Sequence, residues 1–265
     1  MSEERGFTPE EIKQEQNVEA EDTPEKRSNF KVVFFGTSNH RSFDDKRAIE
    51  IATELARDQV ANGGHKIVTG GYEAGVMGAA SKAAAEQAKK LGRNDLIPEG
   101  ITIGKFLGEY AKDSEIKEAD GVLERIRILV EKSNALVVLH GKTGTVVELL
   151  NSISSTALEQ AKNKEDFIPK PVIIVDPSLE HTDLLSFLKR RDPKLERSIG
   201  NIFVVSSSEG QELEKIIQQI SSLIEIYYKE SLGAQETEDE RKLLENFSLK
   251  KFFERQDTFS EGSGI

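Results

Sequence analysis

Short apolar runs, rich in β-branched and aromatic residues, recur along the chain after residue 30. Their apolarity is continuous rather than alternating, which is typical of strands that are buried on both faces of a sheet. The predicted strands are Lys31–Phe35, Lys66–Val68, Ile101–Ile103, Ala135–Leu139, Pro171–Val175 and Ile202–Val205.

Helical periodicity separates these runs. Residues 44–61 and 209–228 carry apolar side chains at the three- and four-residue spacing of one helix face. Further helices are predicted at Ala79–Lys90, at Lys117–Lys132 and from Val146 to about Lys162. In the Lys117–Lys132 helix the predicted buried stripe is Val122, Leu123, Ile126, Leu129 and Val130. Alternating strands and helices predict an α/β fold, a three-layer, doubly wound, Rossmann-like and mainly parallel sheet.

The two ends of the chain read differently from the middle. Residues 1–28 are polar and are expected to form a flexible acidic tail, with a short helix at Pro9–Gln16. Residues 29–231 form the predicted Rossmann-like domain, and residues 232–265 a charged tail with a short docking helix. The apolar residues of that helix are Leu243, Leu244, Phe247, Phe252 and Phe253. The polar stretch Glu109–Asp120 is either a lid over a site or, as we favour, a surface connection.

Composition narrows the function classes. The net charge of −11 argues against general nucleic-acid binding, and the absence of cysteine excludes disulfides and thiolate metal sites. No apolar run has the roughly 20 residues of a membrane span, and the N-terminus lacks the apolar segment of a secretory signal. We therefore expect a cytoplasmic protein without nucleic-acid or membrane partners.

The four histidines stand alone and lack metal-ligand spacing. They are His40, His65, His140 and His181. We expect most of them at the surface or in turns, with a structural role for His140, and no metal site.

Three glycine-containing loops follow predicted strands. In parallel sheets, ligands bind outside the carboxyl ends of the strands, and glycines let backbone N–H groups approach a phosphate at a helix N-terminus. These loops therefore predict a phosphate or nucleotide site. The candidate residues are Gly36, Thr37 and Ser38 in the first loop, Gly70, Gly71, Gly75 and Met77 in the second, and Gly141, Lys142, Thr143, Gly144 and Thr145 in the third.

Two charged residues are candidates for chemistry beside these loops. The spacing of Thr145 and Glu148 fits a capping box, in which Glu148 only stabilises its helix, but Glu148 also points toward the ligand side. Arg125 and Arg127 flank the apolar stripe of the preceding helix. Arg127 has an ion-pair partner in Glu131 at i+4, whereas Arg125 has no obvious one. The spacing alone leaves both choices open.

Together these motifs resemble the LOG ("Lonely Guy") family, long mislabelled as lysine decarboxylase-like. The family pattern G-G-G-x-x-G-x-M-G-A corresponds to Gly70–Ala79, and P-G-G-x-G-T-x-x-E corresponds to His140–Glu148. Counting back from the second motif places the family arginine on Arg125. The chain departs from these patterns at four positions, which are Tyr72 for Gly, His140 for Pro, Lys142 for Gly and Ile126 for Lys.

The resemblance implies a phosphoribohydrolase that cleaves a nucleoside 5′-monophosphate such as AMP into free base and ribose 5-phosphate. It implies that Glu148 acts on the ribose and that Arg125 positions the nucleotide. The phosphate would be held by Gly141, Gly144 and Thr145, with help from Gly70 and Gly71. No cofactor or metal is expected. The resemblance also implies a homodimer or a higher homo-oligomer.

Two other functions remain open on the sequence. One is a non-catalytic nucleotide-binding or sensing protein on the same fold, in which Glu148 only caps its helix. The other is a DNA-processing protein of the wider superfamily, which the acidic composition disfavours.

Overall fold

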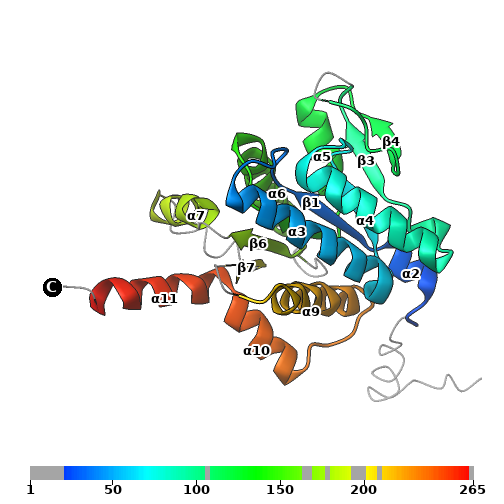
Figure 1. The fold of residues 1–265 in the computed structure, drawn as a ribbon. Coiled ribbons are helices and arrows are strands. Elements are labelled where there is room, and N and C mark those ends of the chain that lie inside the picture. The colour runs from blue at the N-terminus through cyan, green and yellow to red at the C-terminus, as the bar shows by residue number, and fades with distance from the viewer. Residues whose placement is uncertain are drawn as a thin grey trace, which may run out of the picture.

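The computed structural model describes residues 21–104, 108–162, 169–176, 180–191, 201–207 and 211–262. They contain a seven-stranded parallel sheet in the order β4-β3-β2-β1-β5-β6-β7 (Figure 1). The strands are β1 Lys31–Phe35, β2 Lys66–Thr69, β3 Glu99–Thr102, β4 Glu115–Glu118, β5 Ala135–Val138, β6 Val172–Asp176 and β7 Ile202–Ser206. All six strands predicted from the apolar runs are present, with ends that differ by at most two residues.

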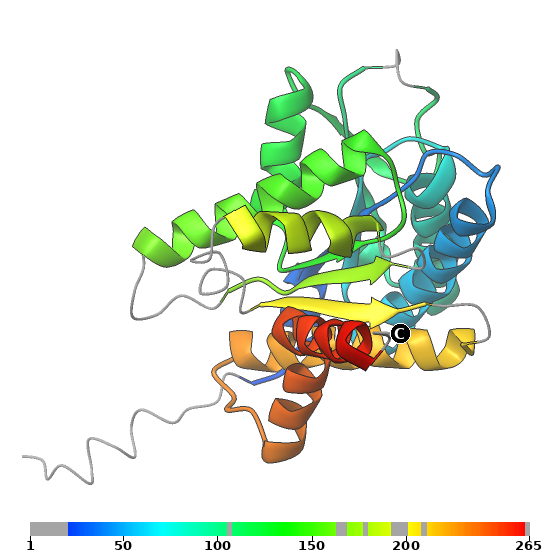
Figure 2. The same cartoon turned by 90° about the vertical axis from the view of Figure 1, so that its left-hand side faces the viewer.

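Helices cover both faces of the sheet, which confirms the three-layer α/β architecture (Figure 2). One face packs against α3 Phe43–Asp58, α4 Gly75–Leu91 and α9 Leu213–Ser231. The other packs against α5 Val122–Lys132, α6 Thr143–Lys162 and α7 Glu180–Arg191. The π-helix η1 Gln59–Gly63 continues α3, and the short 3-10 helix η2 is Asn94–Leu96. None of the helices in the described part of the chain combines the length and apolarity needed to cross a bilayer.

The central strand β1 shows why the strands read as continuous apolar runs. Val32 and Phe34 belong to the core on the α3 side, whereas Val33 and Phe35 belong to the core on the α5 side. All four side chains are at most 2% exposed. Because successive side chains of a strand point to opposite faces, a strand covered on both faces has no polar positions.

The edge strand β4 was not predicted. It lies within Glu109–Asp120, where we expected a lid or a surface connection. Among the described strands it pairs with β3 alone. Its three charged residues are exposed, so a strand that backbone hydrogen bonds hold at the edge shows no apolar run.

The helix predicted at Lys117–Lys132 begins at Val122, because residues 115–118 form β4. Val122 and Leu123 are 52% and 77% exposed, so their assignment to the buried stripe was wrong. They lie in the first turn of α5, and the buried part of the stripe starts at Ile126.

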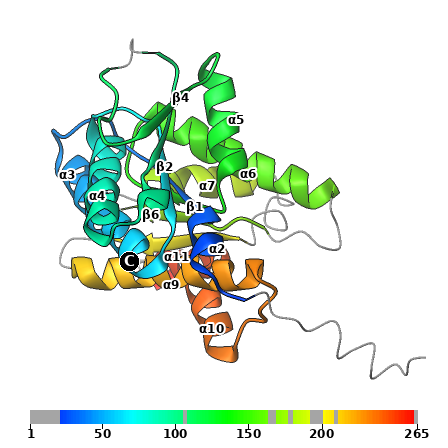
Figure 3. The ribbon, with the colours of Figure 1, turned by 90° about the vertical axis from the view of Figure 1, so that its right-hand side faces the viewer.

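Part of the segment predicted as a flexible tail is helical. Residues Pro24–Asn29 form α2, capped by Thr23, and α2 lies beside the start of β1 and next to α9 (Figure 3). Arg27 donates to both carboxylate oxygens of Glu225 on α9 at 3.1 and 3.3 Å, and the Tyr228 hydroxyl donates to Asp22. The helix predicted at Pro9–Gln16 lies outside the described residues.

The C-terminal segment forms two helices rather than one, α10 Glu238–Phe247 and α11 Leu249–Gly262. Phe247 of α10 packs on the α3-side core, whereas Leu249 and Phe253 of α11 join the α5-side core. Ser248, between the helices, forms a β-bridge with Phe203 of β7. The two helices therefore lie against the outer strand of the sheet, whose backbone would otherwise be open to pairing.

We predict that the contacts of Arg27 make α2 part of the folded unit. The Arg27→Gln variant should lose about 1–2 kcal/mol of unfolding free energy, because charge-assisted hydrogen bonds to Glu225, Asp22 and the Gly63 carbonyl are lost. Urea unfolding measures this change. The matched control is Arg241→Gln, whose arginine pairs with Glu236 at the surface. Equal stability of the two variants would contradict the prediction.

Candidate functional site

The three glycine loops meet at the switch point of the sheet. Strands β1 and β5 are neighbours, but β1 leads to α3 on one face and β5 to α6 on the other. The loops are joined by backbone hydrogen bonds from Thr37 N to His140 O at 2.8 Å and from Val76 N to Thr37 O at 2.9 Å. In doubly wound sheets this crevice outside the carboxyl ends of the strands is the usual ligand site.

The third loop ends in the open N-terminus of α6. This helix begins at Thr143, and its first helical hydrogen bond runs from Val146 N to Lys142 O. The N–H groups of Thr143, Gly144 and Thr145 therefore precede the helical ladder and are donors for an anion. Thr143 and Gly144 are exposed, and a Cβ atom at Gly144 would meet nothing within 4 Å.

The helix start removes the capping-box interpretation of Glu148. Thr145 lies inside α6 rather than before it, so Thr145 is not the N-cap and Glu148 is in the second turn. The Glu148 carboxylate instead accepts a hydrogen bond from Arg125. Sequence spacing could not decide this point, because it does not show where a helix begins.

Arg125 and Glu148 form a buried ion pair beneath these loops. Arg125 Nη1 lies 3.1 Å from Glu148 Oε1, and the two residues are 7% and 9% exposed. Arg125 also donates through Nε to the Ile101 carbonyl of β3 at 2.8 Å, and its Nη2 lies 3.7 Å from the sulfur of Met77. Residues from α5, β3, α4 and α6 thus converge on one guanidinium.

The structure also distinguishes the two arginines of α5. Arg127 is exposed and forms ion pairs with Glu124 and with Glu131, as expected for Glu131 from the i+4 spacing. Arg125 is the residue that the fold turns inward.

Burial brings the pKa of the Glu148 carboxyl group close to physiological pH. Loss of hydration raises the pKa of Glu148 to about 7, although the positive charge of Arg125 and its hydrogen bond lower it. A carboxyl that titrates near neutral pH beside an anion site is a candidate for proton transfer or charge stabilisation.

The second loop is narrow because its glycines leave no space for side chains. A Cβ atom at Gly70 would overlap the Arg125 guanidinium and the sulfur of Met77. Gly75 has φ +61°, and a Cβ atom there would overlap the Thr37 carbonyl. A Cβ atom at Gly141 of the third loop would overlap the Thr145 side chain in the same way. These glycines are required by packing, and their contact with a ligand stays a prediction.

Tyr72, which replaces a family glycine, builds one wall beside the pair. Its hydroxyl donates to Gly104 O at 2.9 Å and accepts from Ile103 N at 3.1 Å. Its ring centroid lies 5.9 Å from Arg125 Cζ. The backbone of Tyr72 bridges to Tyr110, so the start of the polar stretch lies along the second loop.

Of the remaining residues of these loops, some are buried and hold the loops in shape, and others are exposed to solvent. The Thr37 hydroxyl accepts from Asn39 N at 2.9 Å and is 2% exposed, so it supports the first loop in this structure. Ser38 of the first loop and Lys142 of the third loop are exposed to solvent. His140 is buried, with Nε2 3.8 Å from an oxygen of Asp45, in line with a structural role.

The histidines are more buried than predicted. His65, His140 and His181 are at most 9% exposed, so only His40 lies at the surface. Burial lowers the pKa of His65 to about 3, and its ring packs against Phe30 and Tyr228. Within the described residues no cluster of three histidine, aspartate or glutamate side chains could hold a metal.

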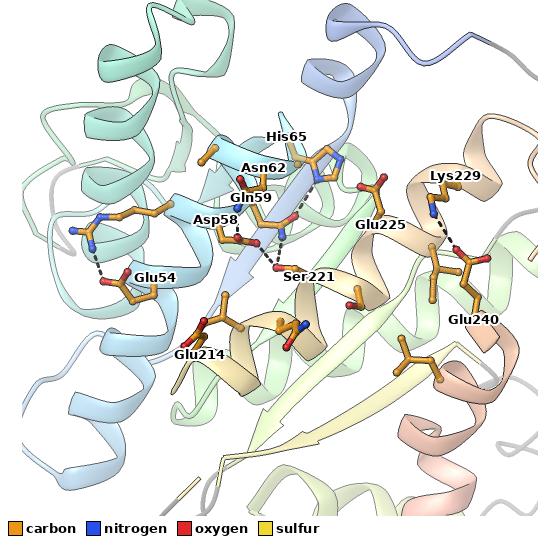
Figure 4. A pocket seen from close by; sticks show the side chains of 18 of the residues that line it. Glu54, Asp58, Gln59, Asn62, His65, Glu214, Ser221, Glu225, Lys229 and Glu240 are labelled. Carbon is orange, nitrogen blue, oxygen red and sulfur yellow. Dashed lines mark hydrogen bonds and ion pairs between the residues drawn. The ribbon is translucent and has the colours of Figure 1, made fainter. Parts of the chain in front are cut away.

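A groove of about 1240 Å³ lies between α3, η1 and α9, at the amino end of β2 and away from the glycine loops (Figure 4). Its polar side chains form a chain of hydrogen bonds that links Asp58, Ser221, Gln59 and His65. The sequence offers no motif for it, because its residues come from ordinary helical positions. The chain ends at His65, whose Nδ1 contacts Gln59 and whose buried Nε2 has no hydrogen-bond partner in the described part of the structure. The groove contains none of the candidate residues.

The fold and its loops define an α/β protein with a candidate anion site at the switch point of a parallel sheet. The model of the family described as "Possible lysine decarboxylase" matches residues 77–216, and the chain belongs to this family. The match begins at Met77 in the first turn of α4 and includes Arg125 and Glu148.

Two plant relatives are named as probable cytokinin riboside 5′-monophosphate phosphoribohydrolases. LOG6 of Arabidopsis thaliana is 31% identical over 136 residues, which are 50% of this chain and 63% of that protein. LOGL6 of Oryza sativa subsp. japonica is 27% identical over 188 residues, which are 69% of this chain and 68% of that protein. The similarity thus spans less than two thirds of the Arabidopsis protein.

Two solved structures with a similar course of the chain bind or carry a molybdenum cofactor according to their names. The molybdenum cofactor carrier protein of Chlamydomonas reinhardtii has a TM-score of 0.48 and 19% identity, over 74% of this chain and 99% of that one. The molybdenum cofactor binding protein of Rippkaea orientalis has a TM-score of 0.46 and 21% identity, over 74% and 96%. Similarities of this extent do not bear on the activity of this chain.

We predict that the Gly70→Ala variant displaces Arg125 from Glu148. Overpacking should cost about 1–3 kcal/mol of unfolding free energy. It should also raise the pKa of Glu148 above about 7, because the carboxylate loses its positive partner. Urea unfolding and NMR titration of the Glu148 carboxyl measure the two effects. The same substitution at the unobstructed Gly144 is the control, and the prediction fails if both variants behave alike.

Proposed function

We propose that the protein hydrolyses the N-glycosidic bond of a nucleoside 5′-monophosphate such as AMP, giving free base and ribose 5-phosphate. The observation that carries this proposal is the buried pair of Arg125 and Glu148 beside the open N-terminus of α6. The names of the two plant relatives support the same reaction class.

The geometry suits a phosphorylated ribose. The N–H groups of Thr143, Gly144 and Thr145 receive the 5′-phosphate, and the partial positive charge of the helix end favours it. Lys142 immediately precedes these groups, is exposed, and adds a positive charge beside the α6 N-terminus. Glu148 follows within about one helical turn, a rise of about 5.4 Å, so the sugar of a bound nucleotide reaches the carboxyl group.

Glu148 acts where positive charge develops. As the bond between C1′ and the base nitrogen breaks, its electron pair leaves with the base and the ribose becomes oxocarbenium-like. The ionised carboxylate stabilises this charge or orients the attacking water. The water oxygen bonds to C1′ and keeps one proton as the new hydroxyl, while its other proton passes to the leaving base, directly or by way of Glu148. Arg125 fixes the orientation of the carboxylate and keeps it partly ionised despite its burial.

We predict that purified protein releases adenine from AMP and that Glu148→Gln lowers kcat by at least about 100-fold, because an electrostatic contribution to the transition state is lost. The amide oxygen of glutamine still accepts from Arg125, so the fold should persist. Chromatography of free adenine measures the rate, and Glu131→Gln on the surface of α5 is the matched control.

The outcomes separate the proposal from its main alternative. Binding of AMP without adenine release by the wild-type chain would favour a nucleotide-binding protein without hydrolase activity. Full activity in Glu148→Gln would remove the assigned role of this residue.

The pH profile supplies an independent prediction. Because the mechanism needs the ionised form of Glu148, kcat/KM should rise from about pH 6 to about pH 8 with an inflection near 7. Below its pKa the carboxyl group is neutral and cannot stabilise a cation. An NMR titration of Glu148 separates this ionisation from that of the substrate phosphate. A Glu148 pKa near the ordinary value of 4.5 would contradict the assignment.

A further inference from the structure

Four lysines surround one buried carboxylate at the amino edge of the sheet. Glu99 is 3% exposed, yet its carboxylate oxygens lie within ion-pair distance of four ammonium groups. The distances are 2.7 Å to Lys31 Nζ, 3.0 Å to Lys117 Nζ, 3.3 Å to Lys132 Nζ and 3.5 Å to Lys66 Nζ. We call this group the Glu99 cluster.

The register of the sheet builds the cluster from distant parts of the sequence. Lys31, Lys66 and Glu99 are the first residues of the adjacent strands β1, β2 and β3, and Lys31 is the register partner of Lys66. Lys117 comes from β4, and Lys132 ends α5. Lys31 and Lys66 of the cluster lie at the amino ends of β1 and β2, whereas the glycine loops follow the carboxyl ends of these strands. Strand β3 is offset, so that Glu99 is in register with Val68 and Gly100 packs against Gly71 of the second loop.

The positive charge of the cluster is only partly balanced. Four lysines face Glu99 and the exposed Glu115, which lies 3.3 Å from Lys66 Nζ, and 4 − 2 leaves an excess of +2. This excess stands out in a chain with a net charge of −11. Burial lowers the pKa of Lys132, as does the neighbouring charge of Lys117.

Glu99 remains ionised as the fixed centre of the cluster. Although burial alone would raise its pKa, the surrounding lysines hold the pKa of Glu99 far below its usual range. A carboxylate has about four acceptor positions, whereas four ammonium groups carry twelve N–H donors between them. Donors are therefore left for a second anion.

A groove of about 400 Å³ opens beside Lys117 and Lys132. Ile101 and Ile128 give it an apolar part, and its size is within the range of small-molecule sites. Its other lining residues are Glu118, Glu124, Arg127 and Glu131. Arg127 forms ion pairs with both Glu124 and Glu131. One arginine against three carboxylates is 1 − 3 = −2, which offsets the excess of the cluster, so an anion is held by the ammonium groups of Lys117 and Lys132 rather than by a net positive charge.

We propose that the Glu99 cluster and this groove form a second anion site, which binds a small molecule with at least two linked phosphate groups. A diphosphate spreads its charge over several oxygens and can accept charge-assisted hydrogen bonds from Lys117 and Lys132 together. Inorganic pyrophosphate and a nucleoside diphosphate both contain such a diphosphate group. Only the nucleoside diphosphate has a base that could also contact the apolar side of the groove.

The test is calorimetric titration of the full chain with pyrophosphate. It is done in the Gly144→Asp background, whose new carboxylate repels anions from the α6 N-terminus without a clash. We expect binding, and an affinity at least about tenfold weaker after Lys117→Gln with Lys132→Gln, since charged donors are lost. The matched control is Lys82→Gln with Lys90→Gln on the exposed surface of α4.

A second variant gives the opposite sign. Glu99→Gln removes the competing carboxylate and should tighten pyrophosphate binding, whereas a purely structural cluster would show no such gain. Absence of binding by both pyrophosphate and ADP, or equal loss in the control pair, would overturn the proposal. Tighter binding of ADP than of pyrophosphate would support the proposal and identify a nucleotide as the ligand. Tighter binding of pyrophosphate than of ADP would identify the inorganic ion as the ligand. None of these outcomes depends on the proposed hydrolase activity.

Discussion

The buried ion pair of Arg125 and Glu148 is the interaction on which the arrangement of the candidate site depends. Moving two charges out of water is costly, and a buried pair is weak evidence for added stability. Arg125 is well satisfied, because it also donates to the Ile101 carbonyl and lies against Met77. Glu148 has Arg125 as its charged partner and titrates near pH 7. The pair therefore adds little stability, and its position beside the open end of α6 is what supports the proposed chemistry.

Helix α5 connects the two charged regions of the molecule. It carries Arg125 near its start and Lys132 at its end, seven residues or about two turns apart. The buried residues Ile126, Leu129 and Val130 hold it against the sheet between them. The same helix thus presents one cation to the carboxyl edge of the sheet and another to the amino edge. Strand β3 supplies the acceptor for each of them, the Ile101 carbonyl for Arg125 and the Glu99 carboxylate for Lys132.

The sequence predicted what depends on local patterns. Strands buried on both faces are continuous apolar runs, so six strands and the fold class followed, whereas β4 is an exposed edge strand without such a run. The choice between Arg125 and Arg127 depended on the family resemblance, because both flank the same stripe. No pattern in the sequence predicted the Glu99 cluster. Its members come from four strands and a helix, and they meet only through the register of the sheet.

The glycine loops show which departures from the family pattern the fold can accept. The glycines that the chain retains at positions 70, 75 and 141 have no space for a Cβ atom. A side chain at position 70 would displace Arg125 and Met77, and one at position 75 or 141 would press on the neighbouring loop. The replaced positions are different. Lys142 projects into solvent at the start of α6, and Tyr72 occupies a wall position where its hydroxyl has two backbone partners. Both side chains are thus accommodated in this structure, and the ion pair of Arg125 and Glu148 forms with them in place. Their effect falls on the charge beside the α6 N-terminus and on the wall beside Arg125 rather than on the fold.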